Sequence, residues 1–81
     1  MADRILVVDD EAIIRESIAL ILRKEGFTVS EAANGNEAYQ KILTDAFDLV
    51  LTDLEMPEMR GIELLEKIVH TSPQTAVIII C

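Results

Sequence analysis

The chain has 81 residues, of which 51% are hydrophobic and 27% charged, and its formal net charge is −8. This length limits the chain to one domain, and the apolar fraction predicts a folded domain rather than a disordered segment. The surplus of acidic residues repels phosphate groups, which argues against direct binding of nucleic acid or of anionic membranes. The single cysteine, Cys81, cannot form an internal disulfide. No export leader or long apolar run is visible, so we expect a cytoplasmic location.

The first part of the sequence predicts a strand followed by a helix. The apolar run RILVV predicts a strand over residues 4–8 that is covered on both faces. A helix is expected from Glu11 to about Glu25, because Gly26 supplies a stop signal. The residues that predict its buried face recur at helical spacing: Ile14, Ile18, Ile21 and Leu22.

The rest of the sequence repeats this alternation. The stretches FTVSEA, DLVLT and TAVIIIC predict strands over 27–32, 48–52 and 75–81. NGNE predicts a capped helix that ends near Asp45, and another helix is expected over 62–70. The buried faces of these two helices are assigned to Ala38, Ile42 and Leu43, and to Leu64, Leu65 and Ile68.

Strands and helices that alternate across short loops specify an α/β fold. The sheet is expected to be parallel and doubly wound, with right-handed crossovers and helices on both faces. No helix follows the fourth predicted strand, so the arrangement is an incomplete (βα)3β unit.

Three carboxylates follow two of the predicted strands. Asp9 and Asp10 come directly after the first strand, and Asp53 comes after the third. Ligands of open parallel sheets bind beyond the carboxyl ends of the strands, so neighbouring strands would bring these side chains together there. A divalent cation would relieve their mutual repulsion, and Mg²⁺ prefers hard oxygen ligands. The sequence therefore makes Asp53 a candidate nucleophile or ligand beside a Mg²⁺ site.

Each carboxylate also has a purely structural interpretation. Asp9 or Asp10 would suit the N-terminal cap of the next helix, which is the commoner use of aspartate in that position. Asp53 before a proline-containing loop is often a turn residue. Only the combination of both sites at strand ends favours the functional interpretation. His70 is expected to be structural or solvent-facing near a helix C-terminus.

At these residues the sequence resembles the receiver domain of bacterial two-component response regulators. ILVVDDE matches the first-strand motif with its acidic pair, and DLVLTDLEMPEMRG matches the phosphoacceptor strand and the loop after it. The family fold is flavodoxin-like, with strand order 2-1-3-4-5, and the resemblance ends inside the fourth strand. Residues 1–81 are therefore expected to be the N-terminal portion of a receiver, without the rest of the receiver or an output domain.

The resemblance implies a role in phosphotransfer signalling. Asp53 would accept a phosphoryl group from the phosphohistidine of a sensor histidine kinase and thereby switch an output domain in the parent chain. The implied Mg²⁺ set is Asp10 directly, Asp9 through water, Asp53, and the backbone carbonyl of Glu55. Such a protein is a phosphoacceptor regulator rather than an enzyme, apart from its own Mg²⁺-dependent phosphorylation and dephosphorylation.

The sequence departs from the family pattern at three places. The resemblance puts Cys81 at the switch position, where a serine or threonine is common, and a thiol is a weak hydrogen-bond donor. The family's phosphate-contacting lysine and aromatic switch residue would both lie beyond residue 81. Arg60 stands where aspartate is frequent in the loop.

Two other functions stay open at this stage. One is an interaction fragment that is not phosphorylated and that self-associates, because the fourth strand would leave an edge of β-branched residues. The other is a phosphohydrolase with an aspartyl nucleophile. Such an enzyme would have a second aspartate two residues later, where this chain has Glu55, and it would give the Asp9–Asp10 pair no role. RGIELLEKI and QTAVIII look somewhat like segments of transcription-activator receivers.

Overall fold

The computed structural model describes residues 3–80, in which four strands alternate with three helices. Every predicted element is present, with small differences at its ends, and the predicted strand end at Cys81 lies outside the described residues. The elements are β1 (Arg4–Val8), α1 (Ala12–Lys24), β2 (Thr28–Ala32), α2 (Gly35–Thr44), β3 (Leu49–Asp53), α3 (Gly61–Thr71) and β4 (Ala76–Ile80).

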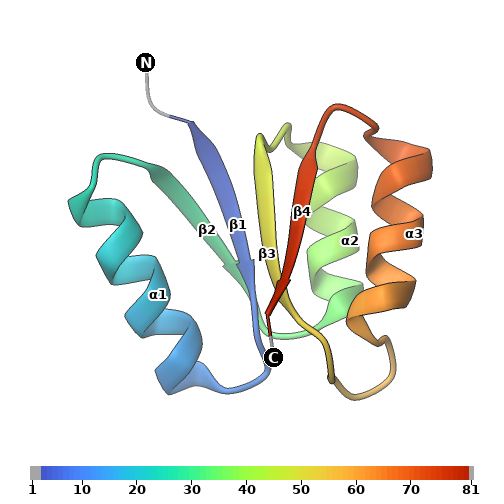
Figure 1. The fold of residues 1–81 in the computed structure, drawn as a ribbon, viewed down its shortest axis with the longest axis horizontal. Helices are drawn as coiled ribbons and strands as arrows, with labels where there is room; N and C mark the ends of the chain where they lie inside the picture. The colour runs from blue at the N-terminus through green and yellow to red at the C-terminus, as the bar shows by residue number, and fades with distance from the viewer. Residues whose placement is uncertain (1–2, 81) are drawn as a thin grey trace.

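The strands form one parallel sheet in the order β2-β1-β3-β4, as expected for the front part of a flavodoxin-like fold. Helix α1 covers one face of the sheet, and α2 and α3 cover the other (Figure 1). Side chains alternate between the faces along β1: Leu6 and Val8 pack in the cluster under α2 and α3, and Ile5 and Val7 pack under α1. Both faces of β1 are therefore buried, which explains its unbroken apolar sequence.

The predicted helix signals act as expected. Asn34 caps α2, because its Oδ1 accepts the N–H of Glu37 at 2.8 Å, and the Glu37 carboxylate accepts the N–H of Ala33 at 3.1 Å. Gly26 ends α1 with φ +96°, and the N–H of Phe27 reaches the carbonyl of Leu22 at 3.2 Å. The local sequence thus sets where these helices begin and end.

The burial predicted for three helix residues is wrong. Ile14, Ile21 and Leu43 are 41%, 61% and 51% exposed. Helix α1 packs on β1 and β2 through Ile18, Ala19 and Leu22, and no described helix covers the same face over β3 and β4. The partly exposed apolar side chains on and beside that area form what we call the open face: Ile14, Ile21, Leu49, Leu51 and Ile78.

None of the described helices is both long enough and apolar enough to cross a membrane.

Candidate functional site

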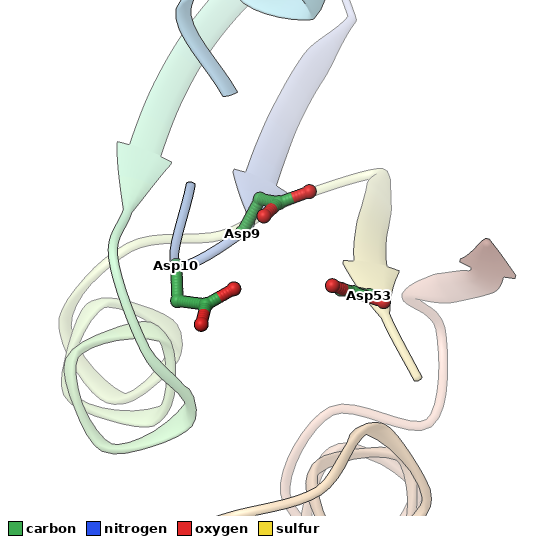
Figure 2. Close-up of side chains that lie close together, drawn as sticks. All are labelled: Asp9, Asp10 and Asp53. Atoms are coloured by element: carbon green, nitrogen blue, oxygen red, sulfur yellow. The ribbon is translucent and has the colours of Figure 1, made fainter. Parts of the chain in front are cut away.

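The pairing of β1 with β3 brings the predicted carboxylates together. Val8 is in register with Thr52, so Asp9, directly after β1, and Asp53, the last residue of β3, lie at the same level of the sheet. One carboxylate oxygen from each of Asp9, Asp10 and Asp53 lies within 4.8 Å of the other two (Figure 2). We call these three residues the acidic cluster. The predicted convergence at the carboxyl ends of two neighbouring strands is confirmed.

The members of the acidic cluster differ in burial and in hydrogen bonding. Asp9 is buried at 4% exposure, Asp53 is half-buried and Asp10 is exposed. Asp9 Oδ1 accepts the N–H of Glu11 at 2.9 Å, and Asp53 Oδ1 accepts the N–H of Glu55 at 3.3 Å. Each bond uses one carboxylate oxygen, so the second oxygen of Asp9 and of Asp53 keeps its lone pairs for other partners.

The structural interpretations of the three aspartates have different outcomes. The N-cap of α1 is Glu11, so the prediction that Asp9 or Asp10 caps this helix is wrong. Asp9 instead accepts the N–H of the cap residue, which fixes the turn between β1 and α1. Asp53 does act as a turn residue, through the N–H of Glu55. That turn does not compete with a functional role, because it also fixes the orientation of the Asp53 carboxylate.

The loop after Asp53 is anchored at several points. The N–H of Leu54 donates to the carbonyl of Ile80 at 3.1 Å, and the N–H of Gly61 donates to the carbonyl of Leu54 at 2.9 Å. Met56 and Met59 are buried in the core beneath α2 and α3, so they pack the loop onto the core. The acidic cluster is therefore built on strand ends whose following loop is tied to the core.

The remaining predicted residues lie around this loop or away from it. Glu55 and Arg60 are both exposed and form an ion pair at 2.9 Å. His70 is exposed in the last turn of α3, in line with its structural interpretation. Cys81, the predicted switch position, lies outside the described residues.

Sequence reasoning missed Arg15. This side chain donates from Nη1 to the carbonyl of Asp9 at 2.9 Å and from Nε to Glu31 Oε1 at 3.2 Å. A signal was available, because a glutamate inside a strand that is otherwise half-buried implies a cationic partner. The identity of that partner depends on how α1 packs against β2, which no local pattern states.

The acidic cluster fits a hard divalent cation. Its donors are three carboxylates, whose nearest oxygens lie within 4.8 Å of one another, and such oxygen sets are what Mg²⁺ prefers. The exposed Asp10 leaves the cluster open to solvent on one side, so a cation has access to it.

Comparison with known proteins gives a consistent family match. The model of the response regulator receiver domain family matches residues 5–81. The transcriptional regulatory protein SrrA of Staphylococcus aureus is 39% identical over 80 residues, which are 99% of this chain and 33% of that protein.

Solved structures agree in fold and sequence. A CheY-like response regulator receiver domain protein from Methanospirillum hungatei has a TM-score of 0.95 at 40% identity, covering 98% of this chain and 63% of that one. The response regulator protein TrrA of Thermotoga maritima, solved in complex with Mg²⁺-BeF, has a TM-score of 0.90 at 40% identity, covering 95% and 67%. The present chain therefore spans only part of each of these proteins.

Proposed function

Because the chain belongs to the response regulator receiver domain family, we propose that it accepts a phosphoryl group on Asp53 in two-component signalling. The observation that carries this proposal is the meeting of Asp9, Asp10 and Asp53 at the carboxyl ends of β1 and β3. The phosphoryl donor is the phosphohistidine of a sensor histidine kinase. Residues 1–81 form the N-terminal portion of the receiver, in line with the 63% and 67% of the two solved chains that it covers.

Asp53 is the nucleophile in this proposal. It is the last residue of β3, and the N–H of Glu55 holds its Oδ1, which leaves Oδ2 to attack. Oδ2 forms a bond to phosphorus while the bond from phosphorus to the donor imidazole nitrogen breaks, so the product is an aspartyl phosphate and a free histidine. Positioning and charge neutralisation supply most of the catalysis, and the protein acts as a regulator rather than as an enzyme with turnover.

The acidic cluster would hold Mg²⁺. Asp10 and Asp53 would bind it directly, Asp9 through water, and Glu55 through its backbone carbonyl. When bound, Mg²⁺ would supply positive charge that offsets the negative charge of the carboxylates and of the phosphoryl group. The burial of Asp9 and the exposure of Asp10 support this division, because a ligand that binds directly must reach the open side of the cluster.

The output lies in the longer parent protein. The name of the relative SrrA supports control of transcription by an output domain, and we place the protein in the cytoplasm. The net charge of −8 supports a signalling role for this segment without direct contact to nucleic acid or membrane. The family match favours a phosphoacceptor over a phosphohydrolase with an aspartyl nucleophile.

Intact mass spectrometry after incubation with acetyl phosphate and Mg²⁺ tests this function. We expect one phosphoryl adduct on the wild-type chain and on Asp3→Asn, a matched loss of charge at an exposed residue before β1. Asp53→Asn should carry no adduct, and EDTA should prevent it on the wild type. A wild-type chain that is folded by circular dichroism but gains no adduct would contradict phosphorylation of this chain.

A second candidate is an interaction role without phosphorylation. Strand β4 is an edge of the sheet, and Ile78 on it is 49% exposed. Exposed β-branched edges favour pairing with another chain, so we propose that residues 1–81 alone self-associate. A wild-type chain that gains no adduct in the experiment above, but that forms oligomers in sedimentation velocity, would favour this role.

A further inference from the structure

Arg15 joins the acidic cluster to the neighbouring strand. It lies in the first turn of α1, and its guanidinium makes two bonds in different directions, to the Asp9 carbonyl at 2.9 Å and to Glu31 on β2 at 3.2 Å. An arginine suits this position, because its planar fork holds two acceptors in a fixed geometry. The side chains of Arg15 and Glu31 are only 16% and 25% exposed, so solvent screens their ion pair less than it screens a surface pair.

Glu31 gives Arg15 a fixed anchor. It stands opposite Val7 in the pairing of β2 with β1. Its other carboxylate oxygen accepts from Arg23 Nη1 at 3.3 Å, and Arg23 Nη2 donates to the carbonyl of Val29 at 2.9 Å. The strand and a second arginine thus hold the Glu31 carboxylate in place. Through Glu31, the position of Arg15 relative to Asp9 is fixed by β2.

That residue, Asp9, is held at each of its polar groups. Its N–H donates to the carbonyl of Ala32 at 3.1 Å, its Oδ1 accepts from Glu11, and its carbonyl accepts from Arg15. Among the described residues, Arg15 is the one side-chain donor to this carbonyl. The carbonyl belongs to the peptide unit that joins Asp9 to Asp10, and a peptide unit is planar. Fixing the oxygen therefore fixes the direction in which the chain enters Asp10.

We propose that Arg15 is a positioning residue for cation binding by the acidic cluster. By holding the peptide between Asp9 and Asp10, it keeps the exposed Asp10 carboxylate beside Asp53 before any cation arrives. This inference rests on the proposed function of the same cluster, and it assigns a role to a residue that touches neither the cation nor the phosphoryl group.

The direction in which Mg²⁺ affinity changes when Arg15 is removed distinguishes a positioning role from a simple charge effect. Arg15 is a cation near the cluster, so as a charge alone it repels Mg²⁺, and its removal would strengthen Mg²⁺ binding. As a positioning residue it preorganises the ligands, and its removal weakens binding. Residues that orient metal ligands typically change affinity by about 10-fold or more.

The experiment is titration of the metal-free chain with Mg²⁺ by calorimetry, without a phosphodonor. Arg15→Gln is expected to weaken binding about 10-fold, and Arg15→Lys to restore part of the loss, because one ammonium cannot reproduce both bonds. Arg23→Gln is the matched control, because it removes an arginine from the same glutamate without touching Asp9. It loosens the Glu31 anchor only indirectly, so it should weaken Mg²⁺ binding clearly less than Arg15→Gln.

Glu31→Gln adds a second route if Arg15→Gln fails to fold. It weakens the anchor of Arg15 and should reduce affinity in the same direction, by less. Equal or tighter binding by folded Arg15→Gln, or an equal loss in Arg23→Gln, would overturn the inference. Failure of the wild type to bind Mg²⁺ would overturn it together with the metal role. A wild type that binds Mg²⁺ but takes no phosphoryl group would overturn the proposed function alone.

Discussion

Gly61 packs directly against the backbone of Asp53. A Cβ atom at Gly61 would lie 2.5 Å from the carbonyl oxygen of Asp53 and 3.1 Å from the Cα atom of Leu54. Both neighbours are backbone atoms, which cannot move aside as the end of a flexible side chain can. The first residue of α3 therefore has to be glycine for the loop to close on the end of β3, which carries Asp53.

Gly61→Ala should reduce both stability and phosphorylation. The added methyl group forces the backbone at Asp53 to shift, and such overpacking typically costs about 1–3 kcal/mol of the free energy of unfolding. Because the shifted residue is the proposed nucleophile, the yield of phosphoryl adduct should fall as well. Urea denaturation measures the first effect, and intact mass spectrometry measures the second.

Gly26→Ala is the matched control for that variant. Gly26 has φ +96° and no atom within 4 Å of its missing Cβ, so alanine there meets only backbone strain, which costs about 1–2 kcal/mol. This control should lose stability but keep its adduct. Equal adduct yields in folded Gly61→Ala and Gly26→Ala would show that the contact with Asp53 does not matter for the chemistry.

Asp10→Asn should stabilise the chain without metal and weaken its response to Mg²⁺. Three carboxylates with oxygens within 4.8 Å repel one another, and Asp10 is the exposed member of the set. Removing its charge should raise the free energy of unfolding in EDTA by about 0.5 kcal/mol, the size of an exposed charge interaction. Added Mg²⁺ at 100 times its Kd should stabilise the wild type by about 2.7 kcal/mol, and the variant by clearly less.

Thermal unfolding of both chains with and without Mg²⁺ checks whether Asp10→Asn is the more stable chain in EDTA and gains less stability from Mg²⁺. Asp3→Asn, which removes an exposed charge away from the cluster, should leave the response to Mg²⁺ unchanged. If Asp10→Asn is no more stable than the wild type in EDTA, repulsion among the three carboxylates does not destabilise the metal-free chain.

Arg60→Asp should be more stable than Arg60→Ala. Arg60 is the N-cap of α3 and makes no side-chain capping bond, whereas an aspartate in that position accepts a backbone N–H of the first turn. The expected difference is about 1 kcal/mol. Both variants lose the ion pair with Glu55, whose exposed partners make it worth little. Urea denaturation of the two variants measures the difference, and equal midpoints would contradict the capping argument.

Much of the fold is predictable from local signals, because those signals act locally in the structure. Asn34 and Glu37 start α2, and Gly26 ends α1, through bonds between residues close in sequence. The meeting of Asp9 with Asp53 follows from topology, since the carboxyl ends of neighbouring parallel strands share one edge.

The errors and omissions have a different physical origin. The exposure of Ile14 and Ile21 depends on what covers the sheet beside α1, which their helical spacing does not report. The bond of Arg15 to Glu31 joins residues 16 positions apart, and it exists only because α1 packs against β2. Sequence patterns predict which face of an element is apolar, but the partner of that face is set by tertiary packing.

Ile78→Lys should reduce self-association of residues 1–81. Ile78 is in register with Leu51 on the open face and stands on edge strand β4, so a pairing chain would meet both unpaired backbone groups and apolar side chains. A lysine at this position places a charge on the edge strand, which disfavours pairing with another chain. Sedimentation velocity over a wide range of protein concentration should show oligomers for the wild type and a shift toward monomer for the variant.

Val69→Lys controls for the added charge. Val69 is 55% exposed on α3, which covers the other face of the sheet, so this variant should self-associate like the wild type. A wild type that stays monomeric at high concentration would contradict the edge argument. Equal loss in both variants would mean that net charge, rather than β4, governs association, because the two substitutions change the charge by the same amount and differ only in the face they alter.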